Sequence, residues 1–297
     1  MTKPTVSAPR LFDPQALLHA RSRAARRPVT FLLETVTQDL ADRLALVKRP
    51  FERAIEIGSV GELVRSAIGR PDLIRLGPPG SGAPIVTADG VLPIGDASVD
   101  LVVSALALQA VEDLPGLLAQ VRRALRPDGL FLAAMIGGST LTELRQALTQ
   151  AEAEVSGGVS PRVWPFVDVR EAGALMQRAG FALPVTDADT LTVRYRSVFD
   201  LMADLRGMAA TNILVDRLRR PTGRRVFLRM AEIYAARFSS PDGRVRASFE
   251  IVWLSGWAPH ESQQKPLRPG SAKARLADAL GTVERTTGDR GSPDGIS

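Results

Sequence analysis

The fold class is decided by residues 99–138, VDLVVSALALQAVEDLPGLLAQVRRALRPDGLFLAAMIGG. Val99–Ala105 is apolar and rich in β-branched residues, which predicts a strand buried on both faces. Apolar residues then recur at helical spacing over Leu114–Leu125, and Asp113 stands where it would cap that helix. After the turn sequence RPDG, Leu130–Ile136 predicts a second buried strand. A strand, a helix and a strand in this order form a βαβ unit, which builds parallel sheets.

Further strands and helices are predicted on both sides of this unit. The strands are expected at Arg53–Ile57, Asp72–Leu76, Ala83–Thr87, Thr190–Tyr195 and Ala247–Gly256. The helices are expected at about 13–48, 63–68, 139–155, 169–179, 197–207 and 223–238. This alternation fits a doubly wound α/β sheet, in which ligands bind beyond the carboxyl ends of the strands.

Composition indicates an ordinary globular chain and excludes several kinds of site. Of the 297 residues, 45% are hydrophobic and 24% are charged. Cysteine is absent, which excludes disulfides, thiolate nucleophiles and cysteine-ligated metals. The two histidines, His19 and His260, argue against a histidine-rich metal site, and we expect no metal. No apolar run reaches the ~20 residues that span a bilayer. No secretory signal is recognised, so we expect a cytoplasmic protein.

Arginines dominate the basic residues of a chain with a net charge of +6. They cluster at 21–27, 217–225 and 244–246, where they could attract nucleic acid or acidic protein surfaces. No aromatic residues interleave with them for base stacking. The clusters are therefore expected to be mainly solvated faces, and nucleic acid is not expected as a partner.

A short motif after the first predicted strand indicates a ligand-binding turn. Residues 56–61, EIGSVG, follow a strand and open a helix, the setting in which a glycine-rich turn binds a ligand. Gly58 would make the tight turn, and Gly61 would let the backbone approach a ligand closely. A plain strand-to-helix turn explains the same sequence, and both interpretations stay open.

Three positions at or after the ends of other strands border the same predicted crevice. An acid normally holds a ribose at the end of the second strand, and here that place is taken by Gly77. Asp89, after the third strand, could accept a hydrogen bond from an adenine amino group or cap a loop. Ser104 would face the crevice if Val103 points away from it, or would only end its strand.

Five stretches carry a family resemblance. They are DLVVSALALQAVEDLPGLL (100–118), LRPDGLFLAAMIGGSTLTELR (125–145), GGVSPRVWPFVDVREAGALMQRAGF (157–181), FDLMADLRGMAATN (199–212) and GWAPHESQQKPLRPGSA (256–272). They lie in order over most of residues 10–272. Through them the chain resembles class I S-adenosylmethionine methyltransferases. It resembles more specifically the methyltransferase-like family of the mitochondrial complex I assembly factor and protein-arginine hydroxylase, with its bacterial relatives.

The resemblance implies a Rossmann-like class I methyltransferase fold. It implies a seven-stranded sheet, with lid helices at about 196–239 inserted before the last strand. One methyltransferase-like domain is then expected over 11–260. A disordered N-terminus at 1–10 and a mostly extended or disordered tail at 261–297 are expected to flank it.

The resemblance also implies a cofactor, a partner and an activity. The cofactor is S-adenosylmethionine, and the partner is a complex I subunit or assembly intermediate, with peripheral membrane contact allowed. The activity is hydroxylation of a protein arginine, for which no catalytic residue is identified. The residues expected at the cofactor are Glu56, Gly58, Ser59, Gly61, Gly77, Asp89 and Ser104.

Departures from the family pattern cluster on the cofactor site. Ser59 and Val60 stand where the family has cysteine and glycine, Gly77 replaces the ribose acid, and Gln109 and Ala110 replace a His-Trp pair. They predict weakened or lost cofactor binding with a retained partner surface. Two alternatives therefore stay open beside the enzyme. One is a catalytically silent assembly or binding module, and the other is a carrier-protein or small-molecule methyltransferase of the biotin-pathway type.

Overall fold

A computed structural model describes residues 10–58, 61–79, 81–87, 90–264 and 281 of the chain. The contacts divide the chain into a compact unit, Met1–His260, and a second unit, Glu261–Ser297. Every helix and strand among the described residues belongs to the first unit. Most of the two terminal segments for which the sequence predicts disorder lies outside the described residues.

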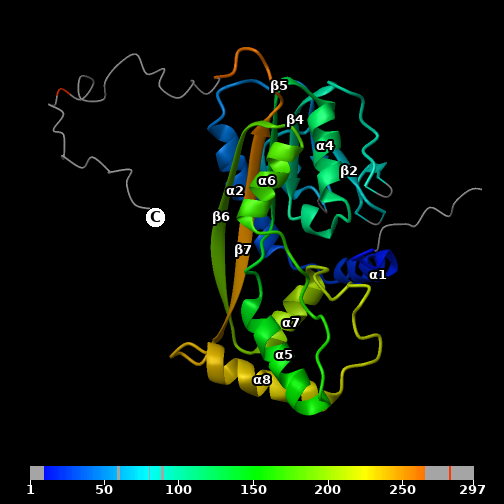
Figure 1. The fold of residues 1–297 in the computed structure, drawn as a ribbon, viewed down its shortest axis with the longest axis vertical. Helices are drawn as coiled ribbons and strands as arrows, with labels where there is room; N and C mark the ends of the chain where they lie inside the picture. Colours follow the sequence, from blue (N-terminus) through cyan, green and yellow to red (C-terminus); the bar gives the residue numbers. More distant parts are fainter. Residues whose placement is uncertain (1–9, 59–60, 80, 88–89, 265–280, 282–297) are drawn as a thin grey trace, which may run out of the picture. The chain divides into compact units, whose positions relative to one another are not determined.

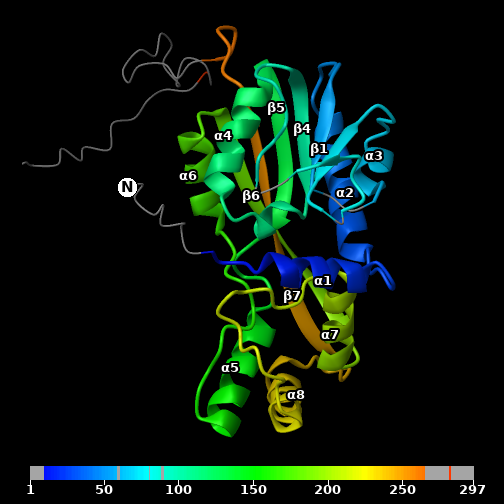
Figure 2. The ribbon, with the colours of Figure 1, turned by 90° about the vertical axis from the view of Figure 1, so that its right-hand side faces the viewer.

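One mixed sheet of seven strands organises the first unit (Figures 1 and 2). The strands are β1 (Ala54–Ile57), β2 (Ile74–Gly77), β3 (Ile85–Val86), β4 (Val99–Ala105), β5 (Leu125–Ile136), β6 (Ala182–Tyr195) and β7 (Val245–Trp257). Their order is β3-β2-β1-β4-β5-β7-β6. The first five are parallel, and β7 runs antiparallel to both β5 and β6. The predicted α/β fold of the class I methyltransferases is confirmed.

Helices cover both faces of this sheet. They are α1 (Pro14–Ala24), α2 (Phe31–Ala45), α3 (Leu63–Ala67), α4 (Leu114–Ala124), α5 (Thr142–Ser156), α6 (Val169–Arg178), α7 (Val198–Gly207) and α8 (Arg224–Phe238). In Figure 2, α4 and α6 lie on one side of the sheet and α2 and α3 on the other. The side chains divide accordingly, because Val102 and Phe131 pack toward α4 and α6 whereas Leu101 and Leu132 pack toward α2.

The long strands β6 and β7 extend beyond the others and carry the inserted helices (Figure 1). α7 and α8 lie between β6 and β7 in the sequence and pack with α5 beside these strand ends. Tyr234 of α8 is fully buried there, and its hydroxyl donates to the Arg246 carbonyl at 2.8 Å. The three helices therefore form a layer attached to the sheet through β6 and β7.

Two sequence expectations about element boundaries are wrong. The segment 13–48 is not one helical stretch but two helices, α1 and α2, and Pro28 lies in the break. The RPDG sequence does not separate helix from strand, because β5 begins directly at Leu125. Asp128 instead bends the strand through a positive φ of 61°, and its N–H donates to the Ala258 carbonyl at 3.0 Å.

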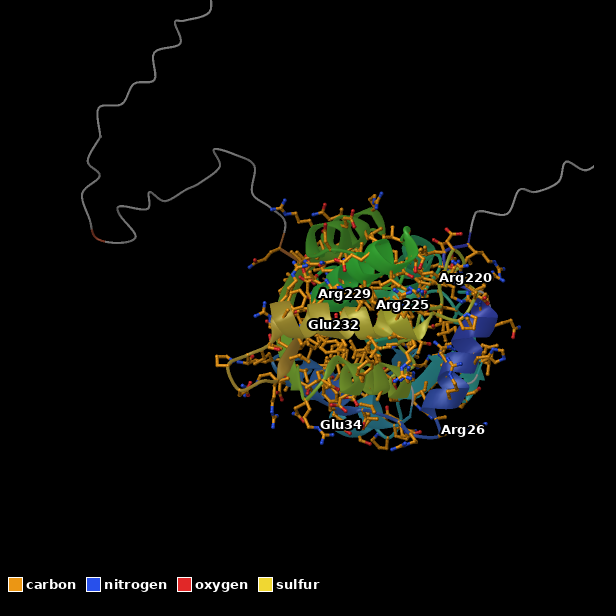
Figure 3. All side chains as sticks on the ribbon, turned by 90° about the horizontal axis from the view of Figure 1, so that it is seen from below. Arg26, Glu34, Arg220, Arg225, Arg229 and Glu232 are labelled. Atoms are coloured by element: carbon orange, nitrogen blue, oxygen red, sulfur yellow. The ribbon has the colours of Figure 1, made fainter. Side chains whose placement is uncertain are left out.

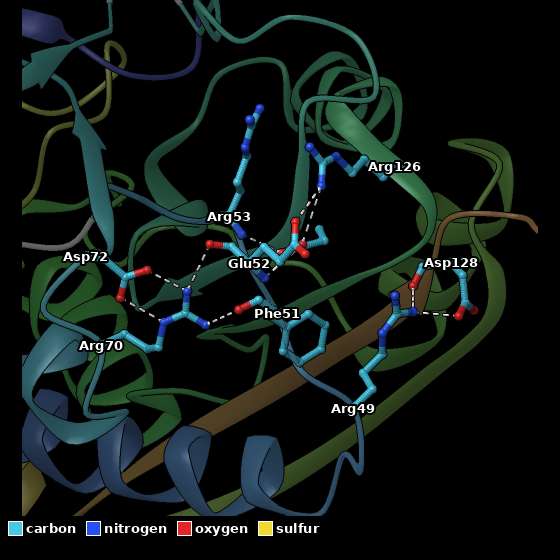
Figure 4. A network of polar contacts seen from close by, with 9 residues as sticks. Arg49, Phe51, Glu52, Arg53, Arg70, Asp72, Arg126 and Asp128 are labelled. Atoms are coloured by element: carbon cyan, nitrogen blue, oxygen red, sulfur yellow. Dashed lines mark hydrogen bonds and ion pairs between the residues drawn. The ribbon is translucent and has the colours of Figure 1, made fainter.

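A polar network holds the amino ends of β1 and β4 (Figure 4). Both oxygens of the Asp100 carboxylate accept backbone N–H groups, from Glu52 at 2.9 Å and from Arg53 at 3.0 Å. Arg70 donates to the Phe51 carbonyl at 2.7 Å from the other side. Since ligands bind beyond the carboxyl ends of parallel strands, this network stabilises the edge opposite to the site.

Candidate functional site

A cavity of about 290 Å³ lies at the carboxyl ends of β4 and β5. The ends of these strands contribute Ala105 and Ile136, and β7 contributes Phe249. Further walls come from segments far away in sequence: α1, the start of α5, the loop 162–166 and the end of α7. Most of the wall is apolar, and the segments that close it come from both ends of the chain.

Helix α1 crosses between the main sheet and the layer of α5, α7 and α8 (Figure 2). The residues just before it are held from two sides. Glu112, which follows β4, accepts the backbone N–H groups of Leu11 and, at 3.1 Å, Phe12. Asp13 pairs with Arg217 at 2.8 Å and caps α1. Hydrogen bonds from the Ala16 N–H and from Arg217 lower the pKa of the Asp13 carboxyl. α1 is thereby fixed as one wall of the cavity.

Gly58 of the predicted ligand-binding turn lies on this cavity. Gly58 has a φ of +86°, which favours glycine. A Cβ at this position would lie 2.6 Å from the Ala107 Cβ, so the turn also depends on glycine for space. Glu56, the acid before the turn, is fully buried on β1. Ser59 and Val60 lie outside the described residues.

The position of the ribose acid is filled by a neighbouring side chain. A Cβ on Gly77 would lie 2.9 Å from the Ser81 Cβ and closer still to its hydroxyl oxygen. Ser81 is only 2% exposed, and its Oγ accepts the Ala83 N–H at 3.3 Å. The described structure therefore brings no carboxylate to the end of β2. Asp89, the predicted adenine contact, lies outside the described residues.

Arg75 ties the two loops beside these positions together, and sequence reasoning missed it. It lies on β2, largely buried, and donates to the Gly61 carbonyl at 2.5 Å and the Gly82 carbonyl at 3.2 Å. It also pairs with Glu62 at 2.6 Å. The one sequence signal was an arginine inside a short apolar strand, where a buried charge needs partners.

Ser104 is placed beneath the turn rather than on the cavity wall. It is fully buried at the end of β4, and its hydroxyl donates to the Ile57 carbonyl at 2.7 Å. This bond joins the end of β4 to the end of β1, directly before Gly58. Its visible role is to hold the turn, and its contact with a ligand stays a prediction.

Besides Thr30 and Thr140, three longer polar side chains line the cavity; sequence analysis placed Gln109 at the cofactor site but did not assign the two arginines to it. Arg162 is paired with Glu152 of α5, which also accepts the Ser160 N–H at 2.9 Å. Burial would raise the pKa of the Glu152 carboxyl, but the bonds from Arg162 and Ser160 outweigh it and lower the pKa. The other two are Arg21 of α1 and Gln109.

Gln109 lines the cavity and carries a buried side-chain acceptor. Its Nε2 donates to the Leu106 carbonyl at 2.6 Å, which fixes the orientation of the amide. Its Oε1 is buried and has no hydrogen-bond partner among the residues described. A buried acceptor without a partner is costly, so a ligand with an N–H or O–H donor would be stabilised here.

The described part of the chain offers neither a metal site nor a membrane-spanning helix. No group of three or more His, Cys, Asp or Glu side chains there is arranged to hold a metal ion. Within the same residues, no helix combines the length and the apolar character needed to cross a membrane.

The residues present fit S-adenosylmethionine in part. Gly58 lies on a cavity, as the amino-acid end of the cofactor requires, and its place has room for no side chain because Ala107 is too close. The ribose end has no carboxylate at Gly77, and Ser81 occupies the room that one would need. The site therefore fits the amino-acid end of the cofactor better than its ribose end.

Comparisons with known proteins agree with the fold. The profile of a methyltransferase domain matches residues 68–133. A Bacillus halodurans protein described as a candidate methyltransferase shares the fold with a TM-score of 0.50 at 12% identity, covering 75% of this chain and 99% of that one. Malonyl-[acyl-carrier protein] O-methyltransferase of Xylella fastidiosa is 40% identical over 57% of this chain and 55% of its own. Mitochondrial arginine-hydroxylase NDUFAF5 of Homo sapiens is 36% identical over 92% of this chain and 84% of its own. The chain therefore belongs to the family of the arginine-hydroxylase NDUFAF5 proteins.

Proposed function

We propose that the protein binds S-adenosylmethionine and hydroxylates an arginine of a protein partner, a complex I subunit or assembly intermediate. Membership of the arginine-hydroxylase family supports this proposal. The single structural observation that carries it is the apolar cavity lined by Gln109, whose buried Oε1 has no partner among the residues described and would face a ligand once the amide turns. The methylene stem of an arginine would pack on the apolar wall, and a guanidinium N–H would donate to Gln109.

The partner and the location belong to the same proposal. Figure 3 shows Arg26, Arg220 and Arg225 toward one side of the face seen from below. None of these three makes an ion pair with a residue in the described ranges. In contrast, Arg229 of α8 is paired with Glu232 at 2.9 Å. The unpaired arginines would attract acidic side chains of the partner. The protein would act in the cytoplasm, with peripheral contact to a membrane through that partner.

A second function, that of a catalytically silent assembly module, is favoured by the ribose corner, which is the end of β2 at Gly77 where the ribose-binding carboxylate is missing. Without a carboxylate at Gly77, the cofactor loses hydrogen bonds that are each worth about 1.5–3 kcal/mol when one group is charged. The cavity and the hold on α1 do not depend on those bonds. A protein that keeps its partner and loses its cofactor would retain this structure.

The carrier-protein methyltransferase has weaker support. The malonyl-[acyl-carrier protein] enzyme matches little more than half of this chain. The arginine-hydroxylase relative matches 92% of it.

The test of the proposed function uses cells that lack the gene. The complex I subunits are analysed by tandem mass spectrometry for an arginine that gains one oxygen atom, and NADH oxidase activity is measured in membranes. We expect both to be lost on deletion and restored by the wild-type gene. A Gln109→Ala variant should restore less of the modification. Restoration of the oxidase activity without any modified arginine would establish the silent module instead.

A further inference from the structure

The wall of the cavity carries one cation that the described structure does not neutralise. Arg21 of α1 lines the cavity and is half-buried. Its guanidinium makes no hydrogen bond, ion pair or ring contact with any residue that the structure describes. Arg162, on the same wall, is paired with Glu152 and donates to Thr222 Oγ1 at 2.7 Å. Of these two arginines that line the cavity, Arg162 is therefore paired with a carboxylate, and Arg21 is paired with none among the described residues.

An unpaired guanidinium in an apolar cavity is unfavourable. Burial lowers the pKa of Arg21, which means that the surroundings disfavour its charge. Arginine nevertheless stays protonated in proteins, so the charge cannot be relieved by losing the proton. It is relieved when an anion binds. The planar guanidinium matches a carboxylate, because two parallel N–H groups can donate to its two oxygens.

The proposed substrate would make an anion favourable, because a second guanidinium in the same cavity would be repelled by Arg21. At a separation of roughly 8 Å and an effective dielectric constant of about 20, this repulsion weakens binding by roughly thirtyfold. A carboxylate beside Arg21 removes that penalty. Gln109 then remains available for the substrate guanidinium.

We infer that the cavity contains a carboxylate-binding subsite, with Arg21 as the cation that holds the carboxylate. The inference rests on the proposed function only for the identity of the second ligand in the cavity, an arginine side chain of the partner. Two sources can supply the carboxylate. One is the amino-acid end of S-adenosylmethionine, since Gly58 of the cofactor turn lines the same cavity. The other is an acidic side chain of the partner next to its target arginine.

The experiment measures binding to the full chain without its partner. Three probes are titrated by calorimetry. S-adenosylmethionine carries the carboxylate, 5′-methylthioadenosine is the same nucleoside without it, and N-acetylglutamate carries a carboxylate without the nucleoside. They are compared on wild type, on Arg21→Met and on the matched control Arg23→Met. Arg23 lies on the same helix but is exposed and makes only a 3.5 Å contact to Thr211.

We expect Arg21→Met to weaken one carboxylate probe by about 10- to 100-fold, the loss of a charge-assisted hydrogen bond. If S-adenosylmethionine is weakened and 5′-methylthioadenosine is not, the cofactor supplies the carboxylate. If only N-acetylglutamate is weakened, the partner supplies it. Arg23→Met should bind all three probes as wild type does.

Two results would overturn the inference. The first concerns binding of the two carboxylate probes. Either they bind the Arg21→Met variant as tightly as they bind wild type, or they show no binding to wild type at concentrations up to tens of millimolar. The second concerns stability without ligand, because removing an unpaired charge should leave the thermal midpoint of Arg21→Met equal or higher. A midpoint below that of Arg23→Met would show a structural role. The proposed function is tested on the partner's arginine, so the two ideas fail separately.

Discussion

Restoring a carboxylate at the end of β2 tests how far the ribose corner limits cofactor binding. Gly77→Asp alone forces its Cβ to within 2.9 Å of the Ser81 Cβ, and Ser81 is almost fully buried. Such overpacking costs about 1–3 kcal/mol, so the thermal midpoint should fall by several degrees. In the double variant Gly77→Asp/Ser81→Gly the collision with Ser81 is removed, and the Ala83 Cβ at 3.1 Å remains as the nearest contact of the new Cβ.

The gain expected from the double variant follows from the bonds it adds. A carboxylate accepting both ribose hydroxyls, with part of the gain lost to solvent, contributes ~2–4 kcal/mol. This is roughly a 30- to 700-fold tighter Kd for S-adenosylmethionine. Calorimetric titration of wild type, both single variants and the double variant measures it, with Ser81→Gly as the reference background. If the double variant binds no more tightly than Ser81→Gly, the missing acid is not what limits the cofactor site.

Three further predictions concern the turn and the cavity wall. Gly58→Ala should lower the thermal midpoint by several degrees and weaken cofactor binding in calorimetry, because its Cβ would lie 2.6 Å from the Ala107 Cβ at a φ of +86°. Arg162→Met should cost about 3–5 kcal/mol in urea unfolding, since it leaves the buried Glu152 carboxylate without its cation; adding Glu152→Gln should recover part of the loss. The folded pKa of Glu152 is lowered, so its contribution to stability is full above the ordinary value of 4.5 and is lost as the pH falls through the folded pKa. Urea unfolding of wild type and Glu152→Gln over a pH series should show a steeper loss in acid for wild type.

The fold was predictable because its signals are local. The buried strand Val99–Ala105 has the predicted bounds, and α4 begins after Asp113, whose carboxylate accepts the Gly116 N–H at 2.8 Å. The break between α1 and α2 was missed, because apolar spacing continues on both sides of Pro28. β6 is longer than Thr190–Tyr195 because its first half pairs with β7, a contact between segments far apart in sequence.

The site was predictable only where one segment carries it. The turn after β1 was readable because a strand, glycines and a helix follow one another within a few residues. The cavity was not, since its walls converge from the start, middle and end of the chain and no single stretch signals them. Gly77 was recognised as a missing acid, but the occupation of its space by Ser81 depends on the path of the following loop.

Helix α1 both closes the cavity and supplies the charged side chain on its wall. α1 brings Leu17 and Arg21 to the wall. The residues before α1 are held by Glu112, next to the end of β4, and by Arg217, in the inserted segment before α8. The position of Arg21 on the cavity wall therefore depends on contacts with both the segment after β4 and the inserted segment, which lie far apart in the sequence.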